Sequence, residues 1–167
     1  APPPMPAFYK EIVYNMTDYA NDAVAHYLKI TGLTYLKKAS TPFCPEGSLI
    51  EADDEVRGQL AGDACSVLMK DLWLARLARP DLQKAICDLA THVLKWSVND
   101  DKRCSRLMCY LNSTREWKLV GRCCDNADDL YLVLYVDADF CGDSDTTKST
   151  TGGWLVLEGP TVHGFHN

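Results

Sequence analysis

The sequence predicts an α+β fold, in which a helical N-terminal two-thirds is followed by a small antiparallel sheet. Apolar residues recur at helical spacing as far as Leu111, whereas from Trp117 onward they alternate with a period of two. Helices first and strands afterwards are typical of an α+β arrangement. With 167 residues and 47% hydrophobic content, the chain is long enough to bury one sizeable core or two small ones.

The first predicted region, residues 1–62, contains a Pro-rich lead-in, one helix and an irregular linker. Residues 1–16 are expected to be extended, and a Pro-rich start of this kind suits docking into a partner's groove. A helix is predicted over 17–31, with Gly32 as its C-terminal cap. The following residues, as far as 62, include turn signals and an acidic run, which predict irregular structure.

The second predicted region, residues 63–115, is helical. Asp63 is a candidate N-cap for a first helix. Pro80 should either end this helix or start the following one. A second helical stripe is predicted from Leu82 to Leu94. Asn99 or Asp100 can cap a third helix. The apolar residues that define the faces of these helices are Val67, Leu68, Leu72, Ala75, Leu77, Leu82, Ala85, Ile86, Leu89, Ala90, Val93, Leu94, Cys104, Leu107, Met108 and Leu111.

The third predicted region, residues 116–167, consists of antiparallel strands. Strands are expected at 117–123, 130–137 and 154–157, with a polar turn at 125–129 and a loop at 141–151. The second of these has the clearest pattern, because leucine and valine alternate with other residues along it.

Charge is unevenly distributed along the chain. The net charge is −6, which makes a strongly basic nucleic-acid binder improbable, but residues 70–122 carry 11 basic and 6 acidic side chains. This middle segment is a candidate for contact with nucleic acid or an acidic partner, although a solvated helix face is the favoured interpretation without interleaved exposed aromatics. The candidate contact residues are Arg76, Arg79, Lys95, Lys102, Arg103 and Arg106.

The 8 cysteines do not favour a disulfide framework, because several occupy helix positions that suit a small apolar residue. We therefore expect an intracellular, reducing compartment. The sequence has no Cys-x-x-Cys pair to suggest a structural zinc site, and Leu130–Val136, its longest strongly apolar stretch, is too short to cross a bilayer. His163 and His166 are interpreted as an exposed tail. No bound cofactor is expected.

Two groups of motifs carry a resemblance to a known family. The first is Ala78-Arg-Pro-Asp81 at the end of a helix, followed by Tyr110-Leu-Asn-Ser-Thr114, with Thr41-Pro42 upstream. The second is Tyr135-Val-Asp-Ala-Asp-Phe-Cys-Gly-Asp143, followed by Lys148-Ser-Thr-Thr-Gly-Gly-Trp154. In this order they resemble copia-type LTR retrotransposon polyproteins, from the end of the reverse transcriptase to the start of the ribonuclease H domain.

The resemblance implies a Mg²⁺-dependent ribonuclease H ancestry with an incomplete site. Asp137 matches the family's first metal-ligating aspartate, and Asp139 is a weaker candidate. Hybrid cleavage uses two metals held by several carboxylates. The family's other ligands lie further along than Asn167, and Asp143 and Asp145 do not replace them. A solvated acidic turn is therefore the favoured interpretation of these aspartates, with no metal held by this chain.

Two functions follow as expectations. The first is a non-catalytic, retroelement-derived structural or interaction subunit, with other protein chains as its partners. The second is a fragment of a reverse transcriptase/ribonuclease H polyprotein that acts on RNA–DNA hybrids when the rest is present, with Mg²⁺ bound once its site is completed. The first is favoured, so this chain by itself is not expected to be an enzyme.

Overall fold

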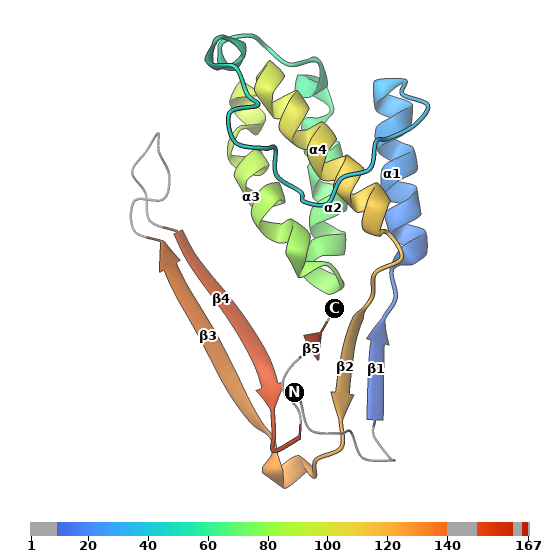
Figure 1. The fold of residues 1–167 in the computed structure, drawn as a ribbon, viewed down its shortest axis with the longest axis vertical. Coiled ribbons are helices and arrows are strands. Elements are labelled where there is room, and N and C mark those ends of the chain that lie inside the picture. Colours follow the sequence, from blue (N-terminus) through green and yellow to red (C-terminus); the bar gives the residue numbers. More distant parts are fainter. Residues whose placement is uncertain (1–9, 140–149, 162–164, 167) are drawn as a thin grey trace. The chain divides into compact units, whose positions relative to one another are not determined.

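The computed structural model describes residues 10–139, 150–161 and 165–166, and its fold is α+β. The chain forms two compact units (Figure 1). The helical unit comprises residues 14–118, and the sheet unit comprises the described parts of residues 1–13 and 119–167. This division differs from the predicted regions, because the first predicted region contributes to both units.

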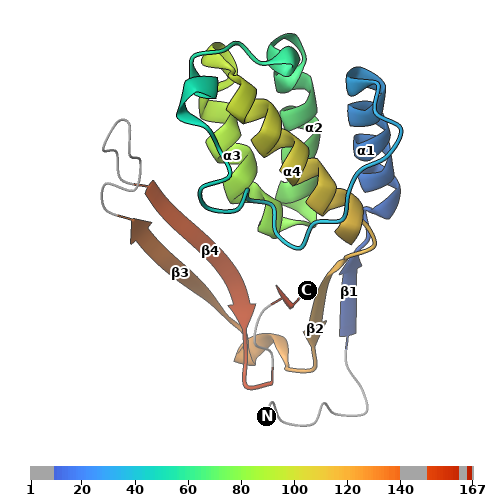
Figure 2. The ribbon, with the colours of Figure 1, turned by 45° about the horizontal axis from the view of Figure 1, so that its top comes forward.

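The helical unit is built from four helices around one apolar core. These are α1 (Thr17–Thr31), α2 (Ala64–Leu77), α3 (Gln83–Thr91) and α4 (Val98–Thr114). Helix α2 lies between α1 and α3, and α4 packs against α1 and α3 (Figures 1 and 2). The largest fully buried apolar side chains of the core are Tyr27, Val67, Leu68, Leu74, Leu82, Ile86, Leu107, Met108 and Leu111.

Short 3-10 helices occupy the connections. They are η1 (Glu51–Asp54), η2 (Gln59–Gly62), η3 (Pro80–Leu82), η4 (Val93–Lys95) and η5 (Ala127–Asp129). The linker before α2 is tied to the segment before α4 by backbone hydrogen bonds, from Gly58 N–H to the Trp96 carbonyl and from Val98 N–H to the Val56 carbonyl. This part of the predicted irregular linker is therefore a packed part of the helical unit.

The helix boundaries show which sequence signals were correct. Gly32 adopts a left-handed conformation, with a φ of 70°, at the C-terminus of α1, as predicted. The prediction that Asn99 or Asp100 caps α4 was wrong, because Ser97 is the N-cap. Asp100 is the N3 residue of a capping box with Ser97, in which each side chain accepts a hydrogen bond from the other residue's backbone N–H.

The predicted helical stripe from Leu82 to Leu94 is shorter in the structure. Helix α3 ends at Thr91, and His92 N–H bonds the Leu89 carbonyl, after which the chain continues as η4. Leu94, which was predicted on the apolar face, is 96% exposed. The break changes the phase of the chain, so Leu94 no longer lies in line with the buried positions of α3.

The sheet unit contains two small sheets. One has the strand order β1–β2–β5, formed by β1 (Lys10–Tyr14), β2 (Leu119–Cys123) and β5 (Phe165–His166). The other is an antiparallel pair of β3 (Tyr131–Asp139) and β4 (Thr150–Glu158), with Leu134 opposite Leu155 and Tyr135 opposite Trp154.

Two features of the strands go beyond or differ from the prediction. β1 falls inside the lead-in, which was predicted to be extended but was given no pairing partner. β4 begins at Thr150, four residues earlier than predicted, because its ladder with β3 extends as far as the Asp139–Thr150 pair. Within the described residues, no helix is both long and apolar enough to cross a membrane.

Candidate functional site

Arg79 is buried at the junction of α2, η3 and α4, although it was a candidate surface contact in the sequence. Its side chain is 1% exposed. The guanidinium donates two hydrogen bonds to the Asp81 carboxylate, from Nε to Oδ1 at 2.9 Å and from Nη2 to Oδ2 at 2.7 Å. It donates two more to Thr114, from Nη1 to the carbonyl at 2.8 Å and from Nη2 to Oγ1 at 2.6 Å.

Two aromatic rings complete the surroundings of this guanidinium. The Arg79 Cζ atom lies 5.8 Å from the centre of the Tyr110 ring and 5.4 Å from that of Trp117, distances at which cation–π attraction operates. Tyr110 also donates a hydrogen bond from its hydroxyl to Asp81 at 2.9 Å. Burial, followed by the Asp81 carboxylate, raises the pKa of the Tyr110 hydroxyl. The Arg79 guanidinium therefore makes its contacts inside the helical unit.

The Arg79 junction brings together residues from the first group of sequence motifs. Arg79 and Asp81 belong to the Ala-Arg-Pro-Asp segment, while Tyr110 and Thr114 belong to the Tyr-Leu-Asn-Ser-Thr segment. These two segments lie about 30 residues apart in sequence, yet Tyr110 and Thr114 of the second form hydrogen bonds with the Arg79–Asp81 ion pair of the first. The motif residues thus fasten the end of α2 to the end of α4.

Lys102 and Arg103 are paired with carboxylates near the start of α4. Lys102 Nζ lies 2.6 Å from Asp53 Oδ2, so the acidic run 51–55 folds back onto the helix. Arg103 Nη1 lies 2.8 Å from Asp100 Oδ1. Hydrogen bonds from His92, Ser97 and Arg103 outweigh the effect of burial and lower the pKa of the Asp100 carboxyl.

The other three basic candidates have different surroundings. Arg106 donates to both the carbonyl and the Oγ1 of Thr41, at 2.9 and 3.0 Å, which connects α4 to the predicted Thr-Pro motif. Arg76 on α2 and Lys95 on η4 are exposed, and no hydrogen bond or ion pair is recorded for either within the described part of the chain. The six candidates therefore do not form one basic face.

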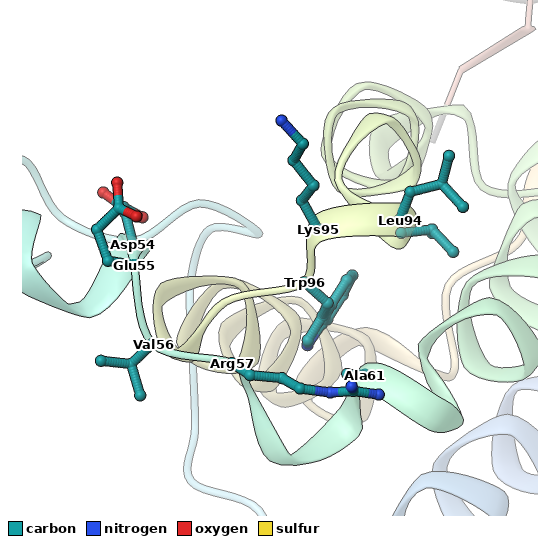
Figure 3. A pocket seen from close by; sticks show the side chains of 9 residues that line it. Asp54, Glu55, Val56, Arg57, Ala61, Leu94, Lys95 and Trp96 are labelled. Atoms are coloured by element: carbon teal, nitrogen blue, oxygen red, sulfur yellow. The ribbon is translucent and has the colours of Figure 1, made fainter.

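Lys95 lines a shallow depression of about 350 Å³ on the helical unit. Its walls come from residues 54–61 and 93–96, and they mix the carboxylates of Asp54 and Glu55 with the cations of Arg57 and Lys95 (Figure 3). Trp96 closes one side, with its ring N–H donating to Asp101 Oδ1 at 2.7 Å. The mixed charges give the depression no clear preference for an anion or a cation.

Asp137 lies near the end of β3, opposite Gly152 of β4, and is exposed. Asp139 ends the strand opposite Thr150. Asp137 is on the same strand face as Tyr135, because the two residues are two positions apart along β3. Asp143 and Asp145 lie outside the described residues. Among the residues that are described, no group of three His, Cys, Asp or Glu side chains is placed to hold a metal ion.

Asp71 is a buried acid that the sequence analysis did not single out. It lies on α2, is 1% exposed, and neither carboxylate oxygen has a hydrogen-bond partner. Burial raises its pKa to about 7, although the nearby Lys70 acts in the opposite direction. The sequence did contain a signal for its burial. Asp71 belongs to the series 64, 67, 68, 71, 74 and 75, whose spacing is that of the buried stripe of a helix.

The seven cysteines within the described residues are free thiols. Cys104 is fully buried in α4, and burial raises the pKa of its thiol above the usual range.

Comparisons with family models, with curated proteins and with solved structures found no match to this chain.

Proposed function

We propose that this chain is a non-catalytic, retroelement-derived subunit that contributes surface to a larger protein assembly. The sequence resemblance supports the proposed ancestry of the chain. The packing of the motif residues inside the helical unit supports its proposed role. The observation that carries it is the Arg79 junction, in which a basic residue that could have met a nucleic-acid backbone instead holds two helices together.

Exposed apolar surface supports an interaction role. In the sheet unit, one face of the β3–β4 pair exposes Leu132, Leu134 and Leu155, each by 60% or more. In the helical unit, Trp73 is 55% exposed. Contiguous exposed apolar residues mark interaction surfaces.

The second candidate is a fragment of a reverse transcriptase/ribonuclease H polyprotein that acts on RNA–DNA hybrids with Mg²⁺ when completed. One observation favours it, namely that Asp137 lies on a strand of an antiparallel pair, as the resemblance implies for the first metal-ligating aspartate. The neutralisation of Lys102 and Arg103 by Asp53 and Asp100 weighs against a hybrid-binding face on α4.

A cleavage assay tests whether the chain by itself is non-catalytic, as proposed. The purified chain is incubated with Mg²⁺ and a labelled RNA–DNA hybrid, beside the Asp137→Asn variant. We expect no hybrid cleavage above the level of the variant, because several carboxylates are needed to place two metals. Cleavage by the chain that is lost in Asp137→Asn would overturn the proposed function.

A further inference from the structure

Helix α2 is apolar on two opposite sides, and the described residues cover only one of them. Its buried side includes Val67, Leu68, Leu74 and Ala75, which face the core of the helical unit. Helices α1 and α3 flank it (Figures 1 and 2). A helix that is hydrophobic all round is normally enclosed by protein on every side, so the outer side of α2 requires an explanation.

The outer side carries a stripe of large apolar residues, which we call the α2 stripe. It consists of Met69, Trp73 and Leu77, spaced four residues apart, so that they lie along one line of the helix. They are 44%, 55% and 38% exposed, respectively. Tryptophan and methionine are enriched at protein interfaces, and an exposed tryptophan often provides much of the binding energy.

The charged side chains that α2 presents at its surface all have the same sign. Its only acidic residue, Asp71, is buried, whereas Arg76 is exposed beside the stripe and Lys70 lies over the Tyr19 ring at 4.8 Å. The charged groups that α2 itself offers to a partner are therefore both cationic. An acidic partner is favoured here, since opposite charges across an interface increase the association rate and the specificity.

We propose that the α2 stripe is a docking site for an amphipathic helix of another protein, with an apolar face flanked by acidic residues. The apolar face of that helix packs on Met69, Trp73 and Leu77, and its carboxylates pair with Arg76 and Lys70. The inference rests on the proposed function of this chain as an interaction subunit, and it names the surface used and the chemistry of the partner.

The test uses the full chain and two labelled synthetic helices of about 20 residues. Both helices carry leucine at every third or fourth position, and they differ only in having glutamate or lysine on the flanks. Binding is measured by fluorescence anisotropy at two salt concentrations. The Glu-flanked helix is expected to bind at least ten-fold more tightly than the Lys-flanked helix at low salt, with a smaller difference at high salt.

Variants locate the contact. Trp73→Ala is expected to weaken binding of the Glu-flanked helix at least ten-fold, and Arg76→Glu several-fold. Leu94→Ala is the matched control, since Leu94 is an exposed apolar residue elsewhere in the helical unit, and its binding should change less than two-fold. Circular dichroism of each variant verifies that the fold is retained.

Several outcomes would overturn the docking proposal. These are equal binding of the two helices, no loss in Trp73→Ala, or self-association of the chain that Trp73→Ala abolishes, which would identify a second copy as the occupant. None of these results affects the proposed function, whose failure appears separately as Asp137-dependent hybrid cleavage.

Discussion

At the scale of single residues, Arg79 should be among the most sensitive positions for stability. Arg79→Ala leaves the Asp81 carboxylate and the Thr114 carbonyl without their cation, and breaking a buried pair in this way costs about 3–5 kcal/mol of unfolding free energy. Arg79→Lys should recover only part of the loss, because an ammonium cannot reproduce the bidentate contact. Urea denaturation measures these differences.

The control for the Arg79 variants is Arg76→Ala, which removes an exposed arginine close by on the same helix. Surface substitutions of this kind change stability by about 0.5 kcal/mol or less. Equal stability of Arg79→Ala and Arg76→Ala would show that the junction does not fasten α2 to α4.

Asp71 gives the fold a pH dependence whose sign can be worked out. Its pKa is about 7 when folded, against 3.8 for an unperturbed carboxyl, so the folded state holds its proton more tightly. The stability that the fold gains from binding this proton more tightly is fully present below pH 4. It declines as the pH rises to about 7, and it is absent above that. At pH 8 the buried charge destabilises the fold by roughly 4 kcal/mol.

Asp71→Leu should therefore raise the unfolding free energy at pH 8 by about 4 kcal/mol. Near pH 4 the increase should be much smaller. Asp71→Asn is the control for charge at constant size, and it should flatten the pH profile without the packing gain of leucine. Urea denaturation at pH 4, 6 and 8 provides the comparison. Parallel pH profiles for the wild type and Asp71→Leu would contradict a buried, unpartnered carboxylate.

At the scale of elements, the close approach of the linker to the start of α4 depends on Gly58. A Cβ at this position would overlap the Ser97 carbonyl and lie 2.7 Å from the Trp96 ring. Gly58→Ala should therefore lower the unfolding free energy by about 1–3 kcal/mol, as overpacking does elsewhere. The thermal midpoint of each variant measures the effect.

Gly62→Ala is the matched control, because a Cβ at Gly62 meets nothing within 4 Å. We expect the control to leave the midpoint unchanged or to raise it slightly, since alanine restricts the unfolded chain. A Gly58→Ala variant as stable as Gly62→Ala would mean that the linker does not pack against α4 in solution.

The elements also show how far sequence patterns reach. The helix over 17–31 and the order of helices before strands were predicted correctly, because apolar spacing reports the local backbone period directly. The N-cap of α4 was predicted incorrectly. Serine, asparagine and aspartate all cap helices, and only the geometry of the capping box distinguishes Ser97. β1 was missed because its pairing partner β2 lies more than 100 residues away in sequence.

The candidate site was harder to predict than the fold. Six basic residues in one segment indicated a possible contact face, but their surroundings depend on distant residues such as Asp53 and Thr41. Charge along a sequence does not reveal which cations are already paired after folding. The position of Asp71 in a buried helical stripe, by contrast, could have been recognised from spacing alone.

At the scale of the whole molecule, the helical unit should fold by itself. Every residue of the hydrophobic core cluster lies between Ala20 and Leu111, within the unit of residues 14–118. A fragment of residues 14–118 should therefore unfold cooperatively in urea, with the helical circular dichroism signal of a folded domain. The same fragment with Leu68→Ala should be less stable by about 2–5 kcal/mol. A fragment without a cooperative transition would refute an independent core.

We propose that this chain works as an interaction subunit of a larger assembly. The most direct measurement is its native size in extracts of the cells that make it, with the chain tagged at its natural abundance. We expect it to elute from a sizing column in a discrete complex far larger than its monomer, at the same position after nuclease treatment. Elution as a monomer, or a large size that nuclease abolishes, would contradict it.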